Sequence, residues 1–126
     1  MNAPAFAQSA YGAQAHSVKT ARDIEHDTLA RITARLRRAA KAEGPGAHPE
    51  LVAALDENGR LWTVFAEDLA TPGNAFPDTL RAGLLSLASF ALQHTSKVLR
   101  QQAEIGPLID INTSVMRGLR GQQGAG

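Results

Sequence analysis

The sequence predicts an all-α protein, a small single-domain bundle of about four helices. Apolar residues make up 44% of the 126 residues, which is enough for a core. Only 5% are aromatic, so leucine, isoleucine, valine and alanine must fill that core, and this composition favours helices over strands. Apolar residues also recur at helical spacings of three and four, and no convincing strand alternation competes with them.

A helical domain is expected between two loose ends. Residues 1–16 are rich in alanine, glutamine and serine without a sustained period, so we expect a flexible N-terminal arm in which only Tyr11 could anchor something. The helical domain follows at residues 17–120. Residues 121–126 are glycine- and glutamine-rich and cannot bury enough surface to order themselves, so we expect a disordered tail.

The first helix is expected over residues 20–43. Thr20 can cap its start, with Asp23 three positions on as an approximate capping box. Its stripe repeats at every fourth residue: Ile24, Thr28, Ile32, Leu36 and Ala40. The Gly-Pro-Gly run at residues 44–46 ends the helix, because proline has no backbone N–H to donate.

The second helix is expected over residues 49–70, with Pro49 suited to the first turn. One face carries residues at spacings of three and four: Leu51, Leu55, Asn58, Trp62, Phe65 and Leu69. Asn58 is therefore a single polar residue in the middle of an apolar face. The Thr-Pro-Gly-Asn turn at residues 71–74 ends this helix.

Two further helices complete the predicted bundle. The third is expected over residues 77–100, and its apolar residues cover most of the circumference, as in the central helix of a bundle. The fourth is short, over residues 107–119, and glycines close its end. Short connections between all four helices favour antiparallel neighbours.

Composition also points to a compartment. The chain has no cysteine, which excludes disulfides and thiolate metal sites and suits a reducing cytoplasm. The first residues have no basic start followed by an apolar run, so no secretory signal is expected. No stretch reaches the roughly 20 apolar residues that span a bilayer. We therefore expect a cytoplasmic protein that does not insert into the membrane.

No catalytic site is expected. The four histidines lie in four different segments, and none has a partner at the spacing of a helical metal pair. His94 is expected to be hydrogen-bonded or half-buried, with a proton-transfer role as the alternative. The acidic pairs at 56–57 and 67–68 diverge by about 100° on a helix and are expected on solvated surface. With no phosphate-binding loop either, the sequence predicts no enzyme, no metal and no cofactor.

The one concentrated charge is a basic run in the second half of the first helix: Arg31, Arg35, Arg37, Arg38 and Lys41. Acidic residues near the start of that helix and basic ones near its end match the helix dipole, and Asp27 is placed to pair with Arg31. No aromatic residues are interleaved to stack on bases. A solvated surface is the first interpretation, and an RNA-binding patch and a protein-binding face are the alternatives.

Two segments are more particular than a generic bundle. The first reads Glu57-Asn58-Gly59-Arg60-Leu61-Trp62, then Phe65, Asp68-Leu69, Asn74, Pro77 and Leu80-Arg81-Ala82. The second reads Leu108-Ile109-Asp110-Ile111-Asn112 and ends in Gly118-Leu119. Together with Tyr11 and residues 22–25, this order and spacing closely resembles the FlaF family of flagellar biosynthesis regulators. Gly59 departs from the longer, helix-favouring residue expected there, at a cost of about 1 kcal/mol relative to alanine.

The resemblance implies a protein needed for flagellin production and export. FlaF-like proteins are described as flagellin regulators or secretion chaperones that work alongside the translational regulator FlbT, and they are not enzymes. Flagellin subunits polymerise through long terminal helices with apolar seams, which must stay unpaired before export. The expected function is therefore a flagellin-binding secretion chaperone that masks such an amphipathic helix in an apolar groove.

We expect that groove between the second and third helices. Tryptophan and arginine are typical of interaction hot spots, and a polar residue in an apolar seam can fix register. The residues expected to contact partners are Asn58, Trp62, Phe65, Asn74, Pro77, Leu80, Arg81, Ile109, Asp110 and Asn112. Core packing is the alternative for Trp62 and Phe65. Bracing the last helix is the alternative for Asp110 and Asn112.

Two other functions would use different faces. A regulator of flagellin synthesis acting with FlbT on flagellin mRNA would grip RNA through the basic run, and such phosphate contacts weaken steeply with salt. An adaptor joining FlbT to flagellin would bind protein on both faces. Capture of an apolar helix should be far less sensitive to salt than RNA binding.

Overall fold

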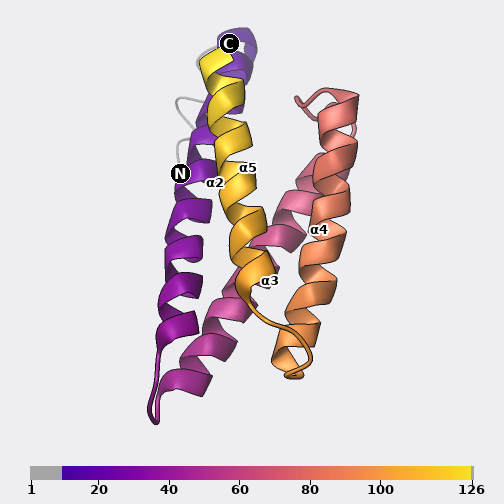
Figure 1. Ribbon diagram of the computed structural model, residues 1–126. Helices are drawn as coiled ribbons and strands as arrows, with labels where there is room; N and C mark the ends of the chain where they lie inside the picture. The colour runs from indigo at the N-terminus through magenta and orange to yellow at the C-terminus, as the bar shows by residue number, and fades with distance from the viewer. Residues whose placement is uncertain (1–9, 126) are drawn as a thin grey trace.

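The computed structural model describes the backbone of residues 10–125 and the side chains of residues 26–118. Four helices follow one another as α2 (Ala10–Lys41), α3 (Ala47–Ala70), α4 (Asp78–Leu99) and α5 (Gly106–Ala125) (Figure 1). The described backbone contains no strand, so the predicted all-α bundle is confirmed. Over the same residues, no helix is both long and apolar enough to cross a membrane.

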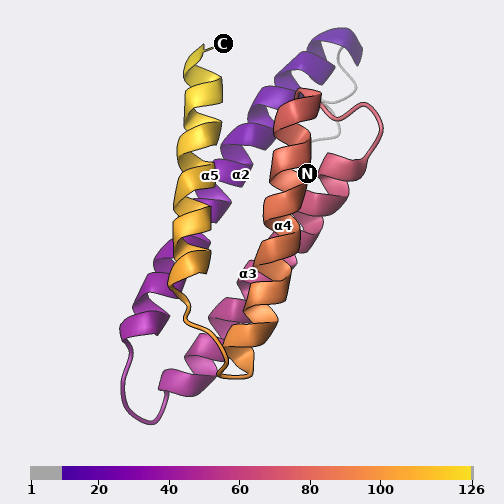
Figure 2. The same cartoon turned by 45° about the vertical axis from the view of Figure 1, so that its right-hand side comes forward.

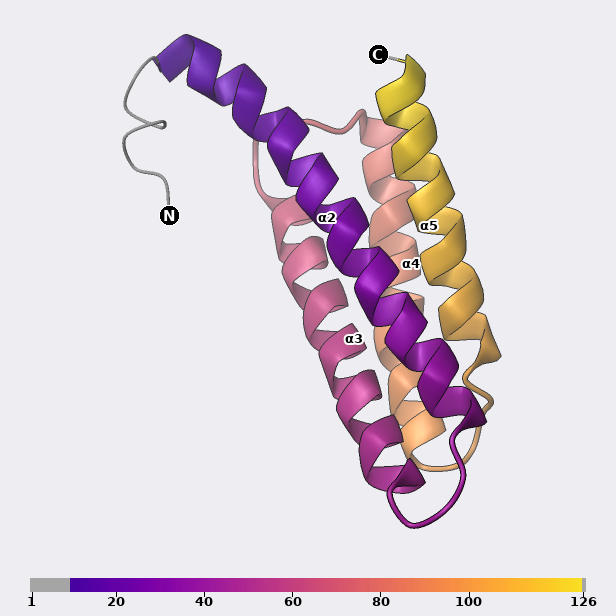
Figure 3. The same ribbon diagram turned by 90° about the vertical axis from the view of Figure 1, so that its left-hand side faces the viewer.

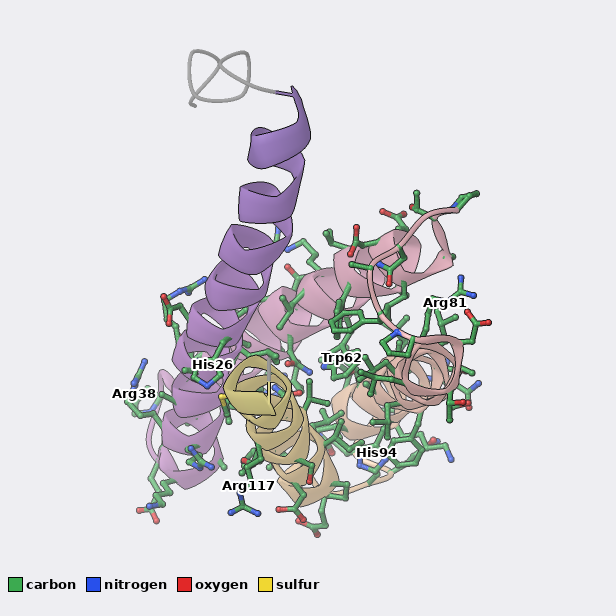
Figure 4. All side chains as sticks on the ribbon, turned by 90° about the horizontal axis from the view of Figure 1, so that it is seen from above. His26, Arg38, Trp62, Arg81, His94 and Arg117 are labelled. Atoms are coloured by element: carbon green, nitrogen blue, oxygen red, sulfur yellow. The ribbon has the colours of Figure 1, made fainter. Side chains whose placement is uncertain are left out.

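Each helix of the bundle packs against two others. The contacting pairs are α2–α3, α3–α4, α4–α5 and α2–α5, so α3 and α5 face each other diagonally, as do α2 and α4. Seen from above, the four helices surround one centre (Figure 4). The α4–α5 pair is the most loosely packed, and these two helices diverge toward the C-terminal end of α5 (Figures 1 and 2).

The core lies between the helices and is built mainly from the predicted apolar stripes. Almost completely buried side chains come from every helix: Leu29, Leu36, Leu55, Trp62, Leu69, Ala88, Ala91 and Leu108. Each large one stabilises the fold by roughly 1.5–3 kcal/mol relative to an exposed position. The expectation that α4 is a central helix is wrong, because Phe90 and Leu99 are 46% and 42% exposed. Since α4 packs only on α3 and α5, another of its faces meets solvent.

Helix α2 begins earlier than predicted. Its first residue is Ala10, so Thr20 lies inside the helix instead of capping it, and residues 10–16 of the predicted arm are helical. Alanine and glutamine favour helix without any apolar period, which explains why periodicity missed this segment. The first turns of α2 lean away from the other helices (Figure 3). Residues 1–9 and the side chains of Tyr11 and Ile24 lie outside the described residues.

Helix α5 extends further than predicted, through the glycines at 118 and 121 to Ala125. Most of the predicted disordered tail at residues 121–126 is therefore helical. A glycine weakens a helix by about 1 kcal/mol but keeps its N–H group, so it does not stop the helix as proline does. Gly126 lies outside the described residues.

The connections use left-handed residues where the chain reverses. Gly44 follows α2 with φ +90°, and Gly73 follows α3 with φ +84°, angles that glycine adopts without a steric clash. After α4 the left-handed residue is Gln101, with φ 62°. The backbone N–H of Gln102 donates to the carbonyl of Lys97 at 2.8 Å, which closes the helix end in the manner of a Schellman turn.

Candidate functional site

Four of the ten residues proposed to contact a partner lie in the core. Asn58, Trp62 and Asn112 are completely buried, and Phe65 is 4% exposed. The Trp62 ring packs at a tilt against Phe65, with 5.6 Å between ring centroids. Figure 4 shows Trp62 directed toward the middle of the bundle. In this conformation none of the four offers surface to a partner, and the alternative of core packing describes Trp62 and Phe65.

Trp62, Asn112 and Asn58 form a hydrogen-bonded relay across the diagonal of the bundle. Trp62 Nε1 donates to Asn112 Oδ1 at 2.9 Å, and Asn112 Nδ2 donates to Asn58 Oδ1 at 2.8 Å. Because an indole N–H can only donate, it fixes the amide of Asn112 with its oxygen toward Trp62 and its nitrogen toward Asn58. The relay joins α3 to α5, so Asn112 braces the last helix and Asn58 sets a register inside the bundle.

Asn74 and Pro77 shape the turn between α3 and α4. Asn74 Nδ2 donates to the carbonyl and the carboxylate of Asp68, at 3.0 and 3.2 Å. Its Oδ1 accepts from the backbone N–H of Phe76 at 3.0 Å, and Phe76 is buried. Pro77 is the N-cap of α4, and its carbonyl accepts the first helical bond, from Arg81. Both side chains therefore have a structural task in the folded chain.

The other four proposed residues do not gather on one surface. Leu80 lines a hollow between α4 and α5, and Ile109 packs against the core. Arg81 pairs with Asp78 at 3.2 Å on the outside of α4 (Figure 4). Asp110 is exposed on α5, so it remains accessible where its neighbour Asn112 is not.

A groove does lie between α3 and α4, as predicted, but other residues form it. Its volume is about 760 Å³. The lining comes from both helices: Pro49, Val52, Ala53, Leu55, Asp56, Gly59, Arg60, Thr63, Leu92, Thr95, Ser96 and Leu99. Val52 on α3 is 37% exposed and Leu99 on α4 is 42% exposed. The groove thus presents large apolar side chains from both of its helices to solvent.

The polar groups of this groove are largely satisfied by the chain itself. Thr63 Oγ1 donates to the carbonyl of Gly59 at 2.9 Å, and Thr95 Oγ1 donates to that of Ala91 at 2.7 Å. Asp56 and Arg60 form an exposed ion pair at 3.2 Å, one helical turn apart. An occupant of the groove would therefore meet an apolar floor beside an already neutralised pair of charges.

A second, smaller hollow of about 180 Å³ lies where α4 and α5 diverge. Three leucines of α4 and small or apolar residues of α5 line it: Leu80, Leu84, Leu87, Ser114, Val115 and Gly118. At about 180 Å³ against about 760 Å³, this hollow has about a quarter of the volume of the α3–α4 groove. It has room for a side chain or two and not for a helix face.

Most of the basic run is engaged within the bundle. Arg35 donates to Glu50 at 2.7 Å and to Glu57 at 2.8 Å, and Arg31 donates to Glu57 at 2.8 Å. Arg37 donates to Thr113 of α5 at 3.0 Å. Arg31 thus pairs with Glu57 instead of Asp27, and the expectation that Glu57 is solvated helix surface is wrong. Arg38 and Lys41 are exposed, with Arg38 on the outside of α2 (Figure 4).

These ion pairs perturb the groups that form them. Hydrogen bonds from Arg31 and then Arg35 lower the pKa of Glu57, and the bond from Arg35 lowers the pKa of Glu50. The two carboxylates in turn raise the pKa of Arg35. The arrangement fastens α2 to α3 and leaves less free positive charge on α2 than the sequence suggests.

Among the described side chains, no group of three potential ligands is placed to hold a metal ion. His94 is half-buried, as predicted, and its Nε2 lies 2.7 Å from the carbonyl of Glu104. The imidazole stacks on Phe90 with 5.2 Å between ring centroids. The histidine therefore ties α4 to the loop before α5.

Comparison with known proteins identifies the family to which the chain belongs. Neither the curated proteins nor the solved structures contained a match to this chain. The family model described as "Flagellar protein FlaF" matches residues 7–119, which include all four core stripes, the diagonal relay and the α3–α4 groove. The resemblance seen in the sequence is confirmed, and the chain belongs to the FlaF family of flagellar proteins.

Proposed function

We propose that this FlaF-family protein is a secretion chaperone that holds a terminal amphipathic helix of flagellin in the α3–α4 groove. Such helices carry an apolar stripe through which flagellin subunits polymerise. A groove of apolar side chains can cover that stripe and keep the subunit unpaired before export. The activity needs neither catalysis nor a cofactor, and its place is the cytoplasm, where flagellin awaits export.

The exposure of Val52 and Leu99 in one groove is the observation that carries this proposal. Covering exposed apolar surface is favourable by roughly 25 cal/mol per Å². The ion pair of Asp56 and Arg60 beside this surface suits the polar residues that flank the apolar stripe of an amphipathic helix. The groove is therefore complementary to one face of such a helix, with apolar residues to meet its stripe and charged residues beside them.

The alternative is a regulator that acts with FlbT on flagellin mRNA through the basic run. The structure weighs against it because three of the five cations, Arg31, Arg35 and Arg37, donate hydrogen bonds within the bundle. Arg35 uses three of its nitrogens to bind Glu50 and Glu57, and the carboxylates beside Arg31 and Arg35 offset the positive charge that would attract phosphate. FlbT as a partner on another face is compatible with either function.

Co-purification with flagellin from the same organism tests the proposal. It is run at low and high salt, with intact flagellin and with flagellin lacking its terminal segments. We expect a complex that survives high salt and needs a terminal segment, because apolar burial is only weakly screened. A complex that dissociates at high salt would contradict an apolar groove as the binding site. The absence of any complex would contradict the proposal and favour the mRNA alternative.

A further inference from the structure

Gly59 stands in the middle of α3, where a glycine weakens the helix. Unlike Gly44 and Gly73, Gly59 does not have a positive φ, so the backbone there does not need the conformations that only glycine adopts easily. Beyond the adjoining residues and the backbone of its own helix, a Cβ built at this position meets no atom within 4 Å, so close packing does not demand glycine either. Within the described residues, the fold has no need for a missing side chain here.

The missing side chain instead leaves the α3–α4 groove open. Gly59 lines that groove between Asp56 and Thr63, its neighbours on the same face of α3. Thr95 and Ser96 line it from α4. A longer residue at position 59 would project into this space, so the glycine determines how deeply an occupant can reach.

We propose that the space at Gly59 is a hole that receives one large apolar side chain of the helix bound in the groove. The inference rests on the proposed function and names the residue that sets its specificity. In knobs-into-holes packing, one side chain of a helix inserts among four residues of the facing surface. Gly59 and Thr63 line the groove from α3, and Thr95 and Ser96 line it from α4, so we assign these four residues to the hole.

The occupant of the hole is apolar because the hole offers little to a polar group. The hydroxyls of Thr63 and Thr95 already donate to carbonyls of their own helices. The two charged residues that line the groove, Asp56 and Arg60, already pair with each other. Six of the other residues that line the groove are apolar: Pro49, Val52, Ala53, Leu55, Leu92 and Leu99. A charge or amide buried against them would lose more hydration than the few hydroxyl oxygens could replace.

A side chain that fills the hole should raise the stability of the free protein and lower its affinity for flagellin. Gly59→Gln replaces glycine with a good helix former, so the Tm of the free protein should rise by roughly 2–6 °C. The same side chain occupies the hole, so affinity for purified flagellin should fall by about tenfold or more. Gly83→Gln is the matched control, because Gly83 is an exposed glycine of α4 with equal space at its Cβ and lies outside the groove.

A size swap identifies the partner side chain. Each large apolar residue of a synthetic flagellin terminal helix is changed to alanine, and binding is measured against the unsubstituted protein and against Gly59→Leu. At one position the alanine should cost the unsubstituted protein about tenfold in affinity, and Gly59→Leu should recover most of that loss. Purely additive effects at every position would overturn the inference.

The binding measurements distinguish failure of the proposed function from failure of the inference about Gly59 alone. If the unsubstituted protein does not bind flagellin, the proposed function and this inference both fall. If it binds and Gly59→Gln binds equally well, the inference alone falls. A drop in Tm for Gly59→Gln would show that the fold itself requires the glycine, which also overturns the inference.

Discussion

Trp62, Asn112 and Asn58 link two helices that lie diagonally across the bundle. Asn112 contributes two atoms, and Trp62 and Asn58 one each, to a chain of two hydrogen bonds in a site closed to water. A buried polar group without its partner costs about 1–3 kcal/mol, so such a relay is favourable only as a unit. Asn58 Nδ2 has no hydrogen-bond partner among the described residues, which makes the far end of the relay its weakest point.

Removing the middle of the relay should destabilise the protein strongly. Asn112→Ala leaves the indole N–H of Trp62 and the Oδ1 of Asn58 unpaired and opens a small cavity. We expect a loss of about 2–4 kcal/mol in the free energy of unfolding, measured by urea denaturation. Asp110→Ala, an exposed change on the same helix, should stay within roughly 0.5 kcal/mol of the parent. Equal stability of the two variants would refute the relay.

Trp62 distinguishes a core role from a partner contact. Trp62→Ala should cost about 3–5 kcal/mol because the side chain is completely buried. Trp62→Phe keeps most of the volume and should lose less, and the fraction that stays folded should bind flagellin as the parent does. Thermal denaturation and binding are measured on both variants. Lost binding at an unchanged Tm would instead assign Trp62 to the interface.

At the scale of elements, ion pairs between side chains hold α2 and α3 together in addition to apolar packing. Arg35 bridges Glu50 and Glu57, and Arg31 joins Glu57 from the preceding turn of α2. Exposed ion pairs contribute little singly, and a shared carboxylate gives this cluster better geometry than an isolated pair. The cluster is partly exposed, so it adds to the apolar contact that Leu29, Ile32 and Leu36 of α2 make with the core.

The ion cluster should give the protein an acid-sensitive component of stability. The pKa of Glu57 is lowered in the folded state, so its contribution is present above the ordinary value of 4.5 and is lost as pH falls through the lower folded value. Glu57→Gln should lower stability at pH 7 by about 1 kcal/mol or less. The gap in Tm to the parent should close below pH 4.5.

Glu67→Gln provides the control for that pH series, because Glu67 is exposed on the same helix. Its Tm should follow that of the parent at every pH. A gap between Glu57→Gln and the parent that stays constant down to low pH would mean that the charge of Glu57 contributes nothing to folding.

The elements themselves could be predicted because each carries an apolar stripe and a Gly or Pro stop. Residues 49–70 and 77–100 are predicted within two residues of α3 and α4. Residues 10–16 and 121–125 are helical but were not predicted to be, because their sequences carry no apolar stripe. Periodicity detects a helix only where apolar residues recur along one face.

The candidate site was harder to predict for a related reason. A stripe of apolar residues marks the core face of a helix, and Trp62 and Phe65 lie on it. Val52 and Leu99 lie on the flanks of their helices and form a surface only because α3 and α4 pack side by side. Sequence could therefore predict the pair of helices that borders the groove but not the residues that line it.

At the scale of the whole molecule, neighbouring helices of the bundle pack with different closeness. α3 and α4 pack closely yet leave a groove along their outer seam, while α4 and α5 diverge (Figure 2). The core is complete without a partner, since the buried set spans all four helices. In the function we propose, a preformed groove would avoid the cost of ordering the protein on binding.

The affinity of Val52→Asp for flagellin, compared with that of Val64→Asp, tests the central claim most directly. Both valines are exposed on α3, at 37% and 64%, so neither change should unfold the protein, and only Val52 lines the groove. Titration calorimetry should give a loss of about tenfold or more for Val52→Asp, because it places a charge against the apolar stripe, and no loss for Val64→Asp. Equal affinities for the two variants would contradict binding in the α3–α4 groove.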